Sequence, residues 1–174
     1  MTEATSASQI EGMPYGVTSQ ISTTQAPTSS FFGASVLKPG YTEILMEYSE
    51  VLFLLSEANG WSQSYYEQGV RASMEKWNID SAKINAFVAA LPPANKQNVL
   101  TQKYVSLFMQ PFEAWAEYRR TGYPNTLLLP GQSAALNVAT ASGQTTYTFT
   151  SLIADLTDLP TRIYYPTTVQ TLNT

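Results

Sequence analysis

Carboxylates are the side chains of this sequence that are best suited to acid–base chemistry. Among 174 residues there are 13 aspartates and glutamates but no histidine and no cysteine, which excludes imidazole bases, thiolate nucleophiles and His or Cys metal ligands. A glycosidase needs two carboxylates that face each other across a cleft. Two sets of carboxylates are candidates for such a pair. Glu50 and Glu57 lie side by side along one expected helix, so they do not face each other, and the second set is Asp155 and Asp158. We therefore expect no enzyme activity, no metal and no cofactor.

Aromatic side chains are the second candidate chemistry, because a flat apolar ring fits the face of a pyranose. Tyr15, Phe31 and Phe32 lie in irregular chain, where binding residues usually occur, so we take them as candidate ligand-binding residues. Two adjacent exposed phenylalanines are costly, so at least one of this pair is expected to be buried. Trp61 sits at a helix junction, where either packing or surface stacking fits, and it is a further candidate.

Two tryptophans and three arginines are expected to have structural roles. Trp77 and Trp115 lie on apolar helical stripes, which indicates core packing. Arg119 and Arg120 are expected to form ion pairs with nearby glutamates rather than to hold an anionic ligand. Arg162 is expected to anchor the C-terminal tail on the helices.

Charge divides the chain into three segments that have to position these side chains. Residues 1–40 and 125–174 contain three charged side chains each and are rich in serine and threonine, so both are expected to be irregular. Residues 41–124 carry the other charges and all of the helical patterning. The net charge is −4 and the basic residues form no block, which excludes nucleic acid as a partner. No apolar run approaches the ~18 residues that a membrane-spanning helix needs.

The middle segment predicts antiparallel helices that are joined by short connections. Helices are expected over 41–58, 62–78 and 81–91, and a fourth begins near 95 and leads into 102–124. The alternating residues 146–150 indicate one short strand. The sequence predicts an all-α fold of TPR-like or α-solenoid hairpins, with long irregular loops and an extended C-terminal tail, although the strict TPR consensus is not present.

Two of these helices are expected in the interior. The helix over 41–58 is apolar almost all round, with a main stripe of Ile44, Tyr48, Val51, Leu52, Leu55 and Ala58. The segment 102–124 is dense in aromatic residues and is expected to be a spine that is buried on most sides. Pro111 lacks an N–H and predicts a kink or a restart within it, and Gly122 predicts its end.

Four stretches of the chain resemble a known family. They are EYSEVLFLLSEANGW (47–61), YYEQGVRASMEKW (65–77), QKYVSLFMQPFEAWAEYRRTGYP (102–124) and LPTRIYYPTTVQTLN (159–173). In this order and spacing they resemble the C-terminal part of the SusD/RagB-like nutrient-binding outer-membrane lipoproteins of Bacteroidetes-type bacteria. The resemblance is strongest to the subgroup described as SusD-like, starch-binding associating with outer membrane.

The resemblance implies a non-catalytic surface lipoprotein that captures a glycan or other nutrient and hands it to a TonB-dependent, SusC-like transporter. It also implies a TPR-like helical fold. Family members are far longer and begin with a secretory signal and a lipidated cysteine, whereas MTEATSASQIEGMPYG lacks the basic start and apolar middle of such a signal. We therefore interpret the chain as a C-terminal portion whose further partner is the N-terminal remainder of the same protein. The alternative is a purely structural helical scaffold that docks this remainder and the transporter.

Overall fold

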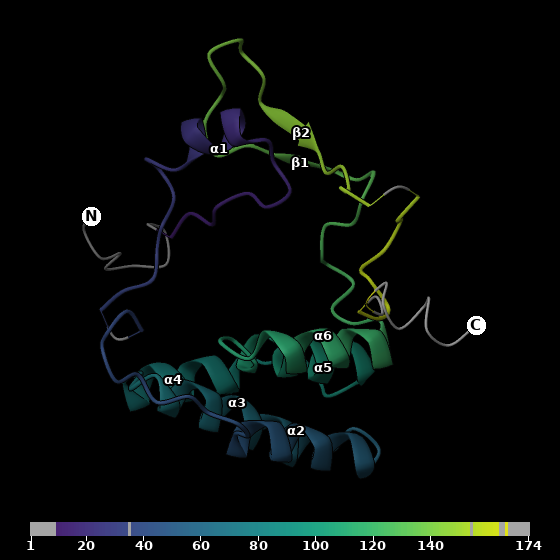
Figure 1. The fold of residues 1–174 in the computed structure, drawn as a ribbon. Helices are drawn as coiled ribbons and strands as arrows, with labels where there is room; N and C mark the ends of the chain where they lie inside the picture. The colour runs from purple at the N-terminus through teal and green to yellow at the C-terminus, as the bar shows by residue number, and fades with distance from the viewer. Residues whose placement is uncertain (1–9, 35, 154, 164–165, 167–174) are drawn as a thin grey trace. The chain divides into compact units, whose positions relative to one another are not determined.

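The computed structural model describes residues 10–34, 36–153, 155–163 and 166. Within these residues the chain is mostly helical, with six helices and one small two-stranded antiparallel sheet (Figure 1). Residues 42–127 form one compact unit, which we call the helical unit. The described parts of 1–41 and 128–174 form the second, which we call the hairpin unit.

The helical unit consists of five consecutive helices. They are α2 (Tyr48–Ala58), α3 (Gln63–Lys76), α4 (Ser81–Ala89), α5 (Lys96–Ser106) and α6 (Pro111–Thr121). The side chain of Asp80 caps α4 and that of Asn95 caps α5, each by accepting hydrogen bonds from the first turn. Pro111 occupies the first turn of α6, and Gly122 ends it in the left-handed conformation with φ 74°. The predicted restart at the proline and stop at the glycine are therefore confirmed.

The core of the helical unit lies where α2, α3 and α5 meet, and Figure 1 shows α2 beside α3. Its fully buried residues are Phe53, Tyr66, Val70 and Val99. A Cβ at Gly69 of α3 would lie 3.0 Å from the ring of Phe53, so the glycine permits the close approach of α2 and α3. The core is therefore centred on α3 and its neighbours rather than on the aromatic segment 102–124.

The expectation of a buried spine over 102–124 is wrong. Helix α6 buries only Glu117 and Tyr118, while Phe112 is 74% exposed. The chain breaks between α5 and α6, where Met109 has φ 78°, so the aromatic residues before and after the break do not share one continuous stripe. The inward face of α6 thus consists of the Glu117 carboxylate and a single buried ring, that of Tyr118, and forms no continuous apolar ridge.

The expected interior position of the first long helix is also wrong. Helix α2 begins at Tyr48 rather than near residue 41. Of its predicted stripe only Leu52 is buried, and the side that packs inward includes two serines, Ser49 and Ser56. The Ser56 hydroxyl donates to the carbonyl of Ser62 at 2.8 Å, so a small polar residue lies at the contact with the start of α3.

The hairpin unit is built from α1 (Ser19–Gln25), β1 (Ser133–Ala135) and β2 (Thr146–Thr148). The two strands pair antiparallel, with Ala134 opposite Tyr147. The strand within 146–150 was predicted from alternation, but its partner and α1 were not. The fold is therefore mostly helical rather than all-α, because the flanks expected to be irregular supply a helix and a sheet.

A glutamine joins α1 to the hairpin. Gln25 is fully buried, and its side-chain amide donates to the carbonyl of Val138 at 2.7 Å and accepts from the Val138 N–H at 3.0 Å. Both hydrogen bonds reach across 113 residues of sequence. Because a buried amide needs both partners, this pair fixes where α1 lies relative to the hairpin.

Candidate functional site

The candidate ligand-binding residue Tyr15 is held firmly in the hairpin unit. Its hydroxyl donates to the carbonyl of Leu128, and the Tyr147 hydroxyl donates to the carbonyl of Tyr15 at 2.9 Å. Its ring meets Phe149 edge-on, with 5.4 Å between centroids and 70° between planes. The side chain nevertheless remains 48% exposed. Tyr15 is therefore an aromatic ring that is fixed at its edge and partly open to solvent.

Gly16 explains how the ring of Phe149 reaches this position. It has φ +73°, and a Cβ placed on it would lie 2.1 Å from the Phe149 ring. Any side chain here would both strain the backbone and displace that ring. The glycine thus positions Tyr15 indirectly.

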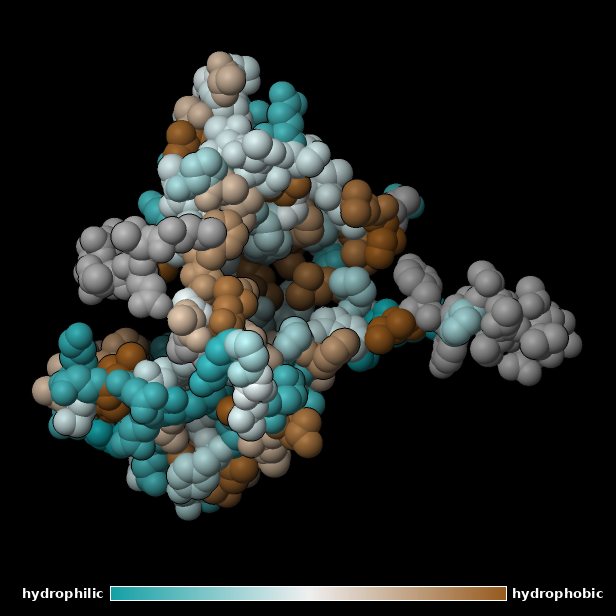
Figure 2. All heavy atoms as spheres, turned by 60° about the vertical axis from the view of Figure 1, so that its left-hand side comes forward, coloured by the Kyte–Doolittle hydropathy of each residue, from teal (hydrophilic) through white to brown (hydrophobic). Residues whose placement is uncertain are grey.

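Phe31 and Phe32 are both more than half exposed in the hairpin unit. The expectation that one of the two is buried is therefore wrong. Their loop is tied to the preceding segment by Ser30, whose N–H donates to the carbonyl of Glu11 at 2.8 Å and whose hydroxyl accepts from the Glu11 N–H at 3.1 Å. These hydrogen bonds fix the backbone and leave two aromatic side chains at the surface. Figure 2 shows one face of the molecule, where hydrophobic residues reach the surface in several places among hydrophilic ones.

Trp61, the fourth candidate, lies in the helical unit, so the structure divides the four candidates between two units. It is partly buried, has φ 65° and packs against the core cluster of Phe53, Tyr66, Val70 and Val99. Of the two interpretations from the sequence, packing is the one that describes this geometry.

The other two tryptophans are partly buried and stack with cations. Trp77 lies 5.6 Å from the ring of Phe108, and the Lys76 ammonium lies 4.8 Å from its centroid. The Arg119 guanidinium lies 4.9 Å from the centroid of Trp115. Both rings are thus partly buried beside a cation, and neither belongs to the fully buried residues of the core.

Arg120 joins two helices through two carboxylates. Its guanidinium donates to both oxygens of Glu57 in α2, at 2.8 and 2.6 Å, and to both oxygens of Glu117, at 3.2 and 2.7 Å. These charge-assisted bonds, first those to Glu57, hold the pKa of Arg120 above its usual value. Arg162 is exposed in the hairpin unit. The neighbouring tyrosines of the RIYYP string lie outside the described residues.

Three carboxylates of the helical unit are buried, which the sequence did not predict. Glu47, Glu50 and Glu117 are each 7% exposed and Lys103 is 3% exposed. The Lys103 ammonium lies 3.0 Å from Glu117. Glu47 pairs with Lys76 and accepts a hydrogen bond from Gln110 at 2.8 Å. We call this set, with Arg120 and Glu57, the ion network, and it joins α2, α3, α5 and α6.

Burial and charge act differently on two of these carboxyls. Burial raises the pKa of Glu50; Lys103 opposes the shift, and Glu113, Glu117 and Glu47 add to it. Burial also acts to raise the pKa of Glu117, but hydrogen bonds from Arg120 and Lys103 outweigh it, and the pKa lies below its usual value. The network thus neutralises its acids inside the unit instead of presenting them to a substrate.

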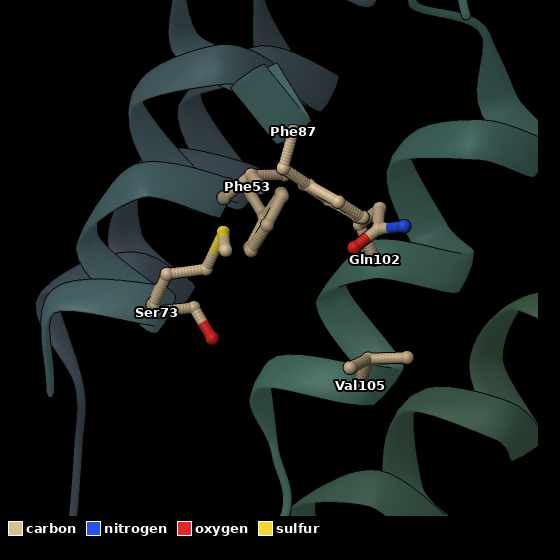
Figure 3. Close-up of a pocket in the computed structure, with 7 residues that line it drawn as sticks. Phe53, Ser73, Phe87, Gln102 and Val105 are labelled. Atoms are coloured by element: carbon tan, nitrogen blue, oxygen red, sulfur yellow. The ribbon is translucent and has the colours of Figure 1, made fainter. Parts of the chain in front are cut away.

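One small cavity lies between α2, α3, α4 and α5 (Figure 3). It has a volume of about 120 Å³, and its only polar side chains are those of Ser73 and Gln102. The remaining lining residues are Phe53, Val70, Met74, Phe87 and Val105. Ligand pockets usually measure about 300–1,000 Å³ and carry several directed polar groups. The cavity is therefore a packing gap beside the core rather than a glycan site.

Among the described residues no cluster of three or more His, Cys, Asp or Glu side chains is placed to hold a metal ion. In the same part of the chain, no helix has both the length and the apolar character to cross a membrane.

Comparison with known proteins identifies the family. Residues 2–147 match the SusD-like family described as "Starch-binding associating with outer membrane", and the chain belongs to this family. SusD-like proteins are non-catalytic binding proteins that associate with the outer membrane.

A solved structure supports the assignment. The chain is 32% identical to a Bacteroidetes protein named AC2a SusD-like, with a TM-score of 0.56. The match covers 74% of this chain and 25% of that one, so this chain spans about a quarter of the relative's length. No curated protein matches the chain. The TPR-like arrangement expected from the sequence is not established by these similarities.

Proposed function

We propose that this chain is part of a glycan-capture protein at the bacterial surface that passes its ligand to a SusC-like, TonB-dependent transporter and catalyses no reaction. The family match over residues 2–147 is the observation that carries this proposal. The proposal includes a lipid anchor at the outer membrane and a TPR-like scaffold to which the helices of the helical unit belong. The ion network supports a binding role, because its acids are paired with Lys103, Lys76 and Arg120 of the same unit.

The hairpin unit carries the proposed ligand contacts. Tyr15, Phe31 and Phe32 are each about half exposed. The Tyr15 hydroxyl is bonded to the Leu128 carbonyl, and the chain before Phe31 is tied to Glu11 through Ser30. A fixed, partly open ring suits stacking on a sugar, because little conformational entropy is lost when the ligand binds. The ligand class is an oligosaccharide.

Isothermal titration calorimetry against a panel of oligosaccharides tests this proposal. The chain is expected to bind at least one of them, and Phe31→Ala with Phe32→Ala is expected to weaken binding about tenfold or more. Phe87→Ala serves as the matched control, since Phe87 is a comparably exposed phenylalanine of the helical unit. Absence of heat across the whole panel contradicts the proposal. Equal affinity of the double variant and the wild type removes the assignment of these rings.

A second function is favoured by the limited span of the chain. Because it corresponds to 25% of the matched relative, part of its surface is proposed to dock the N-terminal remainder of a full-length protein. The chain then acts as a helical scaffold, with or without ligand contacts of its own. Mixing separately produced parts tests this function, and failure of the parts to associate contradicts it.

A further inference from the structure

Helix α2 has two faces of different character. The face that packs inward holds the buried residues Ser49, Leu52, Phe53 and Ser56. The opposite face holds Tyr48, Val51, Leu54, Leu55 and Ala58, which we call the outward stripe. The outward side of this helix is thus more apolar than the side that contacts its own unit. This is the reverse of an ordinary surface helix, whose apolar side faces the core.

The outward stripe is continuous along the helix. Positions 48, 51, 55 and 58 recur at intervals of three and four, so they lie on one side, and residue 54 widens it. Tyr48 is 68% exposed, and Leu54 and Leu55 are 37% exposed each. Single exposed leucines are ordinary, but an unbroken apolar stripe indicates a surface that contacts something else.

The stripe carries no charge of its own. The two glutamates that border it are engaged elsewhere, since Glu57 pairs with Arg120 and Glu50 is itself buried, beside the charge of Lys103. A glycan needs directed hydrogen-bonding groups, which the stripe lacks apart from the tyrosine hydroxyl. An apolar helix face matches it better, because helices pack by interlocking apolar ridges.

The matched solved structure indicates where such a helix comes from. Three quarters of that protein has no counterpart in this chain, because the match covers 25% of it. A helical layer buries its apolar side against another layer of the same domain. The part of a full-length relative that has no counterpart here is therefore long enough to supply a helix that covers the outward stripe.

We infer that the outward stripe of α2 is the docking surface for an amphipathic helix from the remainder of a full-length SusD-like protein. This docking surface adds a partner to the proposed function. It rests on that function in one respect, namely that the chain is part of such a protein. It requires no glycan and no transporter. The docking helix presents an uncharged apolar face, centred opposite Val51 and Leu55.

A competition experiment tests the inference. The part of the AC2a SusD-like protein without a counterpart here is produced separately, and that protein's own matching quarter is labelled as the reference ligand. The 174-residue chain is expected to displace the label in fluorescence polarisation. Leu55→Glu is expected to raise the competing concentration at least about tenfold, because a buried charge lies at the centre of the contact. Phe112→Glu, on the exposed side of α6, is expected to compete like the wild type.

Each other outcome overturns the inference. Lack of displacement by the wild type, or equal competition by Leu55→Glu, removes the stripe as the docking surface. The inference is also overturned if the labelled quarter of the AC2a SusD-like protein does not bind the rest of that protein, because the two parts then do not dock. A wild-type dimer in sedimentation velocity that Leu55→Glu dissociates assigns the stripe to a second copy. A lower melting temperature of Leu55→Glu alone shows that the chain already covers the stripe itself.

The same variant separates this inference from the proposed function. Glycan binding is assigned to the hairpin unit, so Leu55→Glu is expected to leave the calorimetric affinity for oligosaccharides unchanged. Failed competition with retained glycan binding removes the docking surface alone. Successful competition without any glycan binding removes the ligand-capture function and leaves the docking surface.

Discussion

The helical unit and the hairpin unit are stabilised by different means. The helical unit combines a small apolar core around Phe53 and Tyr66 with a buried ion pair of Lys103 and Glu117, to which the more exposed Arg120 adds a second cation. The hairpin unit depends on side chains that hydrogen-bond to distant backbone, as Gln25 does with Val138. The difference shows how the molecule combines a rigid scaffold with short, surface-lying segments that expose aromatic rings. Four substitutions test it, in order of expected effect.

The largest effect is expected from Lys103→Met in the helical unit. Removing this 3%-exposed ammonium leaves Glu117 without one of its two cations and Glu50 without its main attractive charge. Breaking a buried ion pair costs about 3–5 kcal/mol. Urea unfolding followed by helical circular dichroism measures the loss. Lys83→Met on the exposed side of α4 is the control, and equal losses for both variants contradict the role of the ion network.

A comparable change in the hairpin unit is Gly16→Ala. The added Cβ meets the Phe149 ring and strains a backbone with φ +73°, so a loss of about 1–3 kcal/mol is expected. The midpoint of unfolding is measured by near-ultraviolet circular dichroism, to which Tyr15 and Phe149 contribute together with the other aromatic side chains. Gly12→Ala is the matched control, because nothing lies within 4 Å of its Cβ. If both variants melt alike, Gly16 is not needed for this packing.

Gln25→Ala is expected to affect the hairpin unit alone. It removes two hydrogen bonds and leaves the Val138 N–H and carbonyl without them, at a cost of about 1–3 kcal/mol. Hydrogen exchange of the Val138 amide is expected to accelerate, while amides of α3 keep their protection. Gln20→Ala on the exposed side of α1 serves as the reference. Unchanged exchange at Val138 shows that the hairpin does not depend on this contact.

The smallest effect is a dependence on pH within the ion network. The pKa of Glu50 is raised by burial in the folded state, so its contribution to stability is present at low pH and is lost as pH rises through that pKa. Glu50→Gln is therefore expected to stabilise the helical unit at neutral pH, with a gain that shrinks as the solution is acidified. The pH dependence of the urea midpoint measures this. A loss of stability at neutral pH contradicts it.

Glu117→Gln is the matched comparison, because the sign is opposite. The pKa of Glu117 is lowered in the folded state, so its contribution is present above the unfolded value and is lost as pH falls through the folded one. This variant is expected to be less stable than the wild type at neutral pH. If Glu50→Gln and Glu117→Gln change the stability at neutral pH in the same direction, the two carboxyls are not distinguished by their partners.

Local features of the helical unit were predictable from the sequence. Helices expected at 62–78 and 81–91 are observed as Gln63–Lys76 and Ser81–Ala89. Capping by Asp80 and the stop at Gly122 depend only on neighbouring residues, which explains why these boundaries agree. Family membership was predictable as well, because it rests on residue strings that need no knowledge of packing.

The packing partners were not predictable in the same way. Periodicity identified the apolar residues of α2. It does not say which side of the helix packs against the rest of the unit, and the larger apolar side is the exposed one. The burial of Glu47 and Glu50 depends on Lys76, Gln110 and Lys103, which lie in other parts of the unit and which no local pattern connects to them. Helix α1 has no apolar stripe, and its position depends on Gln25 and a contact 113 residues away.

That long-range contact has a consequence for synthesis on the ribosome. Gln25 emerges early, but its partner Val138 follows 113 residues later, after the whole helical unit has been translated. The helical unit consists of one uninterrupted stretch of chain and forms mainly local contacts, which favours early and rapid folding. The hairpin unit closes only afterwards. Phe31 and Phe32 are therefore exposed on an incompletely folded chain until the hairpin unit closes. Such segments are most accessible to chaperones during this period.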